Sequence, residues 1–391
     1  MSALNDKKLT FALLCLANIT ISFNFAALAA VVPAISRDLM LPDVQVSRIL
    51  HYYMIPYGLG AMIYAPLARR INYRNILIGS VSLYSAMNWI CAAQDSLPII
   101  LLARIFMGLA AAAIVPLTLI VMGKGFEKQI RGRLVGMFFS TSFIASLFGL
   151  FLSGMAHWRW LFYIPLFLGV VNIILIAFVG SSILRAKETV SINYFKVFRQ
   201  PRIRRILGFI FVISFLYHGV HKWFGVYLDR EYHLHQGLIS FFFILIALFG
   251  VFGQNLGGWL TDHKGRFNAC QIGVSILALA TMSLYGHYPL FVLGMIFAAF
   301  SIGWTIGHNG VSTVLTDMPE ETRSEIASLN SFIRFFSGGL GFFVGGPFVE
   351  KNFGMAFLCF GILMFLSSLF LEKIIPQEAS PAAEKSFVAE S

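Results

Sequence analysis

The sequence predicts an all-α membrane protein in which twelve transmembrane helices form two pseudo-symmetric six-helix bundles. Three observations predict this fold class. Of the 391 residues, 58% are hydrophobic and only 12% are charged, which is about half the charged share of an average soluble domain. The apolar residues gather in twelve runs that are long enough to cross a bilayer. A basic segment divides these runs into two sets of six, and short loop sequences recur between the sets.

Each run supplies one helix, because a membrane span needs about 20 consecutive apolar residues. The first set covers about 9–33, 48–66, 75–93, 98–122, 133–155 and 160–182, and the second covers about 205–227, 236–259, 269–286, 290–315, 327–348 and 353–372. The first run follows Lys7 and Lys8 but is about 25 residues long, too long for the apolar core of a signal peptide. We expect an N-terminal bundle over 1–183, a cytoplasmic linker over 184–204, a C-terminal bundle over 205–373 and a disordered cytoplasmic tail over 374–391.

The distribution of Lys and Arg predicts the orientation. With both termini in the cytoplasm, 21 basic residues lie on the inner side and five on the outer side. Inner loops of membrane proteins are enriched in Lys and Arg. The sequence therefore predicts a multi-pass protein of the plasma membrane, in bacteria the inner membrane, with both termini inside.

Composition also argues against several functional classes. The formal charge of +11 comes largely from short loops between spans, so it indicates topology and no nucleic acid is expected as a partner. All four cysteines lie in apolar runs without a CxxC spacing, and we expect no metal and no other cofactor. One His218-x-x-His221 pair is too few for a desaturase-type enzyme, and GxSxG and HExxH are absent from the sequence.

Two loop sequences suggest an internal repeat. The segment 65–75 after the second run aligns with 258–268 after the eighth at an offset of 193, and 127–131 aligns with 319–323 at an offset of 192. Two matches at nearly one offset indicate a duplicated six-helix half.

These motifs resemble the major facilitator superfamily. Gly258-x-Leu260-x-Asp262-x-x-Gly265-Arg266 is similar to the family's loop motif GxLxDxxGR, and Arg104-x-x-x-Gly108 is similar to its fourth-helix motif. The first-half loop departs from the motif, with Ala65, Arg69 and Asn72 in place of Gly, Asp and Gly. The resemblance implies a secondary transporter that works by alternating access, and we expect it to be a monomer.

The loop motif predicts a gate formed by Gly258, Asp262, Gly265 and Arg266. Gly265 permits a turn with positive φ, and Asp262 can accept hydrogen bonds from a helix start or pair with a cation. A simple solvated loop is the alternative.

Cations lie at membrane depth without acidic partners in the spans. His218, His221 and Lys222 share one helix face near the middle of the seventh run. A charged Lys there costs about 2.5–3.5 kcal/mol on insertion scales and usually faces a wet cavity. A structural polar network is the plainer alternative. Arg104, His308 and Arg334 lie in the fourth, tenth and eleventh runs, which the resemblance places around or beside one central cavity.

These cations predict an anionic solute, which would relieve their mutual repulsion. Each also has a structural explanation: Arg104 can organise neighbouring spans, Arg334 can cap a broken helix and His308 can make a packing hydrogen bond. The full set of predicted solute contacts is Arg104, His218, His221, Lys222, His308, Arg334, Asn18, Asn24, Tyr52, Tyr217 and Trp304.

The expected function is transport of a small carboxylate, a polycarboxylate siderophore or an organophosphate. His51, His218 and His308 are candidates for proton coupling, because imidazole titrates near neutral pH; uniport and anion exchange stay open. Proton-coupled multidrug efflux is the first alternative, and a solute sensor with a transporter fold is the second.

Overall fold

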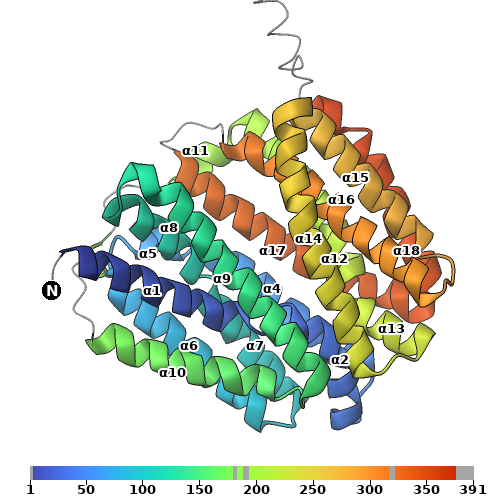
Figure 1. Ribbon diagram of the computed structural model, residues 1–391, viewed down its shortest axis with the longest axis horizontal. Helices are drawn as coiled ribbons and strands as arrows, with labels where there is room; N and C mark the ends of the chain where they lie inside the picture. The colour runs from blue at the N-terminus through green and yellow to red at the C-terminus, as the bar shows by residue number, and fades with distance from the viewer. Residues whose placement is uncertain (1–2, 179–182, 188–192, 317–321, 376–391) are drawn as a thin grey trace, which may run out of the picture. The chain divides into compact units, whose positions relative to one another are not determined.

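The computed structural model describes residues 3–178, 183–187, 193–316 and 322–375. Within these ranges the regular structure is helical (Figure 1). The predicted helical fold class is therefore confirmed. The predicted disordered tail over 374–391 lies outside the described residues, apart from Ile374 and Ile375.

Nine helical segments in the described part of the chain are long and apolar enough to cross a membrane. Three of them join two shorter helices each. The other three predicted spans are the second, ninth and twelfth. The second is broken, and the ninth and twelfth correspond to the shorter helices α15 (Arg266–Ser283) and α18 (Phe353–Ser368).

The chain divides into two compact units. Unit 1 comprises the described residues of 1–192, 224–241 and 327–339, and unit 2 comprises those of 193–223, 242–326 and 340–391. Two segments of the predicted C-terminal bundle, 224–241 and 327–339, thus belong to unit 1.

Unit 1 contains the first ten helices, one complete later helix and parts of two others. The ten are α1 (Ala3–Ser22), α2 (Ala27–Leu39), α3 (Asp43–Val46), α4 (Arg48–Ala61), α5 (Tyr64–Leu67), α6 (Tyr73–Ala93), α7 (Leu97–Ala111), α8 (Ile114–Gly125), α9 (Lys128–Met155) and α10 (Trp160–Phe178). It also holds α13 (Phe224–Tyr232), the start of α14 (Gln236–Lys264) and the middle of α17 (Arg323–Lys351).

Unit 2 contains the rest of α14 and of α17 together with the remaining helices. They are α11 (Tyr194–Phe198), α12 (Pro201–His221), α15 (Arg266–Ser283), α16 (Leu290–Thr316), α18 (Phe353–Ser368) and the 3₁₀ turn Leu371–Lys373. Helix α15 packs against both α16 and α18 (Figure 1). The thiol of Cys270 lies 3.4 Å from the carbonyl oxygen of Gly307, so small residues bring α15 and α16 close together.

Proline explains two of the breaks in the spans. A proline ring clashes with the carbonyl group four residues earlier and lacks the N–H that would bond to it. Pro66 lies four residues after the break at Met62, and Pro116 lies four residues after the break at Ala112. The second and fourth spans are therefore interrupted where the local sequence requires it.

The first span is interrupted at 23–26 without a proline, and side chains of other helices bond the carbonyl groups at its edge. The hydroxyl of Tyr84 donates to the carbonyl oxygen of Ile21 at 3.3 Å, and that of Ser146 donates to the carbonyl oxygen of Ser22 at 3.1 Å. In lipid an unsatisfied backbone group is costly, so these partners stabilise the break.

Candidate functional site

A cavity of about 400 Å³ lies within unit 1. Each contributing helix supplies residues at three- or four-residue spacing, so one stripe of each helix faces the space. The lining residues are Asn18, Ile21, Ser22, Phe25, Tyr53, Tyr57, Val115, Leu119, Phe139, Ser142, Ser146, Ala327, Asn330, Ser331, Arg334 and Phe335.

Within the described part of the chain, Arg334 is the one charged residue that lines the cavity. It projects from α17, and the lining set contains no Asp or Glu. An arginine guanidinium carries several N–H donors in a planar fork, which suits a carboxylate or a phosphate. At Arg334 the cavity therefore offers an anion a positive charge and hydrogen-bond donors.

Aromatic rings form one wall of the same cavity. The rings of Tyr57 and Phe335 are 4.1 Å apart at their centroids, and those of Phe25 and Phe335 are 5.7 Å apart. Tyr53 continues the wall, 5.8 Å from Phe25. This wall offers an apolar face to a flat or aromatic part of a solute.

Another part of the cavity lining is polar. The amide nitrogen of Asn18 donates to the carbonyl oxygen of Phe138 at 2.8 Å and to the hydroxyl of Thr141 at 3.1 Å. The hydroxyls of Ser22 and Ser142 bond at 3.0 Å. These bonds hold the amide and the hydroxyls of α1 in place against α9.

Of the predicted solute contacts, Asn18 and Arg334 therefore line this cavity. Asn24 instead joins a buried network, in which its amide nitrogen donates to Asn88 at 3.2 Å and its oxygen accepts from Tyr84 at 3.1 Å. Tyr52 is half-buried, and its ring lies 5.1 Å from that of His51.

Arg104 lies outside the lining set. It is 1% exposed, its Nε donates to the carbonyl oxygen of Ile49 at 3.0 Å, and its guanidinium carbon is 4.2 Å from the centre of the Tyr53 ring. One turn later, Gly108 faces the Tyr53 carbonyl oxygen so closely that any side chain would clash. In this structure the fourth-helix motif fastens α7 to α4.

Lys222 belongs to unit 2 and caps the C-terminal end of α12. The seventh span is interrupted here, between α12 and α13, and Lys222 is only 4% exposed. The three predicted cations therefore occupy different surroundings: a cavity for Arg334, a helix interface for Arg104 and a helix break for Lys222.

The remaining predicted residues form an aromatic cluster in unit 2. The rings of Tyr217 and Trp304 stack at 3.8 Å, and His221 stacks on Tyr217 at 5.1 Å. The rings of His218 and His308 lie 5.9 Å and 5.6 Å from Trp304. The Nδ1 atom of His218 is also 2.9 Å from the carbonyl oxygen of Ser214.

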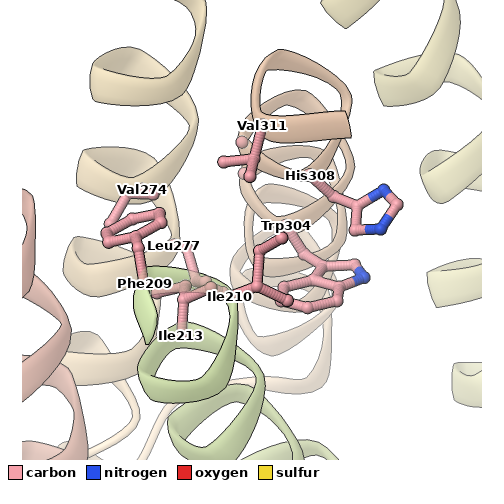
Figure 2. A pocket seen from close by; sticks show the side chains of 10 residues that line it. Phe209, Ile210, Ile213, Val274, Leu277, Trp304, His308 and Val311 are labelled. Carbon is pink, nitrogen blue, oxygen red and sulfur yellow. The ribbon is translucent and has the colours of Figure 1, made fainter. Parts of the chain in front are cut away.

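Beside this cluster, α12, α15 and α16 enclose a small void of about 20 Å³. Figure 2 shows the imidazole of His308 and the indole of Trp304 on the same side of α16, directed away from Phe209 and Val274. The void has room for about one water molecule and is lined mostly by apolar side chains. It is therefore too small for an organic solute.

The predicted gating motif lies at the junction of α14 and α15. Gly265 has φ +80° and ψ +164°, so the predicted positive φ is confirmed. Asp262 is exposed in the last turn of α14 and forms no ion pair with the described residues. Gly258 has open space where a Cβ would be, and Arg266 begins α15.

Two crossed ion pairs join α13 to the α2–α3 region of unit 1. The Nη1 atom of Arg37 is 2.7 Å from Oδ1 of Asp229, and the Nε atom of Arg230 is 2.7 Å from Oδ2 of Asp43. Gly225 in α13 also packs against the carbonyl oxygen of Ala29 in α2. We call these four charged residues the charge clamp.

Sequence reasoning did not identify Asn330, Tyr57 or Phe335 as site residues. A usable signal existed, because the lining residues of α17 follow a helical stripe of 327, 330, 331, 334 and 335 around the predicted Arg334. Tyr57 and Phe335 could not be singled out in the same way, because the chain has 40 Phe and 13 Tyr.

Comparison with known proteins establishes the class of this membrane protein. The family model of the Major Facilitator Superfamily matches residues 14–342. The chain therefore belongs to the Major Facilitator Superfamily of transporters, and the predicted resemblance is confirmed.

Individual relatives are distant. The chain is 23% identical over 339 residues to the uncharacterized MFS-type transporter YwfA of Bacillus subtilis, with 82% of each chain covered. It is 26% identical over 148 residues to the multidrug export protein EmrB of Haemophilus influenzae, covering 36% of this chain and 29% of that protein.

Solved structures share the fold. The nucleoside transporter NupG superposes with a TM-score of 0.76 at 11% identity, covering 94% of this chain and 100% of that one. A D-xylose–proton symporter gives a TM-score of 0.72 at 13% identity, covering 94% and 98%. At these identities the likeness concerns the fold alone.

Proposed function

We propose that this chain is a secondary transporter for a small organic anion, which binds in the unit 1 cavity beside Arg334. One observation carries the proposal: among the sixteen described residues that line the cavity, Arg334 alone is charged. Charge-assisted hydrogen bonds to an anion are worth about 1.5–3 kcal/mol each. A lipophilic cation would instead meet a like charge and no carboxylate.

The proposed transport cycle is alternating access between two closed ends. The charge clamp would close the outer end, and the Asp262 loop would act at the cytoplasmic end, with both termini in the cytoplasm of a bacterial cell. The predicted topology supports this assignment. Arg37 follows the first span, which runs outward from the cytoplasmic N-terminus, whereas Asp262 follows the eighth span, which runs inward.

Proton coupling through a histidine forms part of the proposal. His218 and His308 both lie against the Trp304 ring, and imidazole is the side chain suited to proton exchange near neutral pH. His51, buried in α4, is the third candidate. Replacement of His308 by Gln should abolish pH-driven uptake into proteoliposomes while solute exchange continues.

Direct binding to the purified protein tests the anion proposal. Phenylacetate, citrate and glycerol 3-phosphate represent the anion classes, and ethidium represents cationic drugs. Arg334→Gln should weaken binding of the preferred anion by about tenfold or more, since 1.4 kcal/mol corresponds to one decade. Arg334→Lys should restore only part of this affinity, because a point charge replaces the fork.

Arg48→Gln is the matched control. Arg48 is exposed at the start of α4 and does not line the cavity, so its removal should leave anion affinity unchanged. Binding of ethidium without binding of any anion, undiminished in Arg334→Gln, would overturn the proposal.

Multidrug efflux is the second candidate function. It is favoured by partial similarity to the multidrug export protein EmrB and to the multidrug efflux pump SdrM of Staphylococcus aureus, which is 27% identical over 148 residues. The aromatic wall of the cavity also suits lipophilic compounds. The same binding experiment separates the two candidates by the charge of the ligand.

A further inference from the structure

The hydroxyl groups that line the unit 1 cavity fall into two sets. On α1 and α9 they bond to the neighbouring helix: the hydroxyl of Ser22 donates to that of Ser142 at 3.0 Å, and the hydroxyl of Ser146 donates to the carbonyl oxygen of Ser22 at 3.1 Å. This first set holds α1 against α9, so its bonds serve the packing of unit 1.

The second set consists of the hydroxyls of Tyr57 on α4 and Ser331 on α17. Neither forms a hydrogen bond within the described part of the chain, and neither oxygen is completely enclosed by protein. Tyr57 is 8% exposed, Ser331 is half-buried, and both line the cavity. A hydroxyl group can donate one hydrogen bond. These two hydroxyls are therefore available to a solute in the cavity.

Close packing of α4 against α17 brings both hydroxyls to the wall that holds Arg334. A Cβ added at Gly58 in α4 would lie 2.8 Å from a backbone nitrogen of α17, so the two helices touch here. The ring of Tyr57, the preceding residue, lies 4.1 Å from that of Phe335. Ser331 precedes Arg334 by three residues, which places both on one side of α17.

The charge of the lining restricts the solute further. Among the described residues of the lining, the one formal charge is the positive charge of Arg334. A monocarboxylate balances it, whereas a dianion leaves a negative charge inside the protein, which is costly without a partner. The guanidinium fork and two hydroxyls also supply donors to both oxygens of one carboxylate.

We infer that Tyr57 and Ser331 determine specificity by donating hydrogen bonds to the carboxylate that Arg334 binds, and that the transported solute is an aromatic monocarboxylate. The rings of Phe25 and Phe335, 5.7 Å apart, form the wall that receives the aromatic part. The cavity volume of about 400 Å³ falls within the range of small-molecule sites. This inference rests on the proposed anion function and narrows it.

Three matched ligands test the solute class by calorimetric titration of the purified protein near neutral pH. Phenylacetate is the monocarboxylate, phenylmalonate carries a second carboxylate on the same carbon, and 2-phenylacetamide replaces the carboxylate by a neutral amide. We expect phenylacetate to bind at least about tenfold more tightly than either analogue, because only phenylacetate matches the single positive charge and accepts charge-assisted hydrogen bonds.

Two conservative variants test the hydroxyls. Tyr57→Phe and Ser331→Ala should each weaken phenylacetate binding by about tenfold, the size of one hydrogen bond to a charged group. Ser331→Thr keeps a hydroxyl and should restore most of the affinity. Without ligand, all three variants should unfold at the parent temperature, because these hydroxyls bond to no described residue. Tyr163→Phe and Ser140→Ala are the matched controls, since both residues are exposed and lie outside the lining set.

The outcomes separate the inference from the function on which it rests. Parent affinity for phenylacetate in Tyr57→Phe or Ser331→Ala, with binding lost in Arg334→Gln, would overturn the role of the hydroxyls and leave the anion proposal standing. A lost affinity that accompanies a lower unfolding temperature would also overturn this role.

The ligand series separates them in the same way. Binding of phenylmalonate or citrate as tight as that of phenylacetate would overturn the monocarboxylate class and leave the anion proposal standing. Equal binding of phenylacetate and 2-phenylacetamide, or failure of every anion to bind, would count against both.

Discussion

The guanidinium of Arg37 lies 2.7 Å from the carboxylate of Asp229, and the same distance joins Arg230 to Asp43. The α2–α3 region contributes Arg37 and Asp43, and α13 contributes Arg230 and Asp229. Each side thus supplies one cation and one anion. The acids are the more buried partners, with side chains 22% and 12% exposed at Asp229 and Asp43. This arrangement favours one register of α13 against the α2–α3 region.

Breaking the charge clamp should favour opening at this end of unit 1. Each partly exposed pair contributes about 0.2–1 kcal/mol, so Asp229→Asn should raise the open population up to about fivefold. Spin labels at Met40→Cys and His233→Cys would report the opening as a longer distance component. The exchanged pair Arg37→Asp with Asp229→Arg should restore the parent distribution, and an unchanged distribution in Asp229→Asn would exclude the clamp as a gate.

Arg104 should contribute to stability more than to solute binding. Its guanidinium bonds to Ile49 and covers the Tyr53 ring, so Arg104→Met should lower the free energy of unfolding by about 1–3 kcal/mol. Anion affinity should change less than threefold, in contrast to Arg334→Gln. Thermal denaturation and titration of the same preparations measure both quantities. A large loss of anion affinity with unchanged stability would contradict this prediction and show that Arg104 contacts the solute.

Gly265 should tolerate no other residue without strain. Its φ of +80° and ψ of +164° fall in a region that is essentially restricted to glycine. Gly265→Ala should destabilise the protein by about 1–3 kcal/mol. Gly258→Ala is the control, because Gly258 is inside α14 with open space around it, and this change should be neutral or stabilising.

Asp262 should affect turnover more than binding. It forms no ion pair with the described residues in this structure, so a locking role requires a partner in another state of the cycle. Asp262→Asn should slow transport into proteoliposomes severalfold with anion affinity preserved. His263→Gln, the exposed neighbour, serves as the control. Normal transport by Asp262→Asn would show that this loop is not a gate.

Cysteine labelling tests the predicted orientation. Met40 is 90% exposed between the first two spans, and His263 is exposed after α14. A membrane-impermeant maleimide should label Met40→Cys in intact cells and should label His263→Cys only after permeabilisation. The reverse pattern would invert the topology inferred from the Lys and Arg distribution.

The sequence by itself determined that this protein is a bundle of membrane helices, and it did so for a physical reason. The bilayer requires about 20 apolar residues for each span, so a run such as 98–122 is visible without any knowledge of its neighbours. The loop motif also predicted the positive φ at Gly265. The breaks before Pro66 and Pro116 were not predicted, although a local rule explains them once they are seen. These features depend on short stretches of chain.

The tertiary structure alone decided which polar residues share one space. Arg104, Lys222 and Arg334 are similar in sequence context, since each is a cation inside an apolar run. Their environments depend on how far each helix is rotated and where it is broken. Arg104 turns toward the Ile49 carbonyl, whereas Arg334 turns toward the cavity with Asn330 and Phe335. Helical spacing predicts which residues share a stripe, but the neighbours of that stripe are set by packing between segments far apart in the chain.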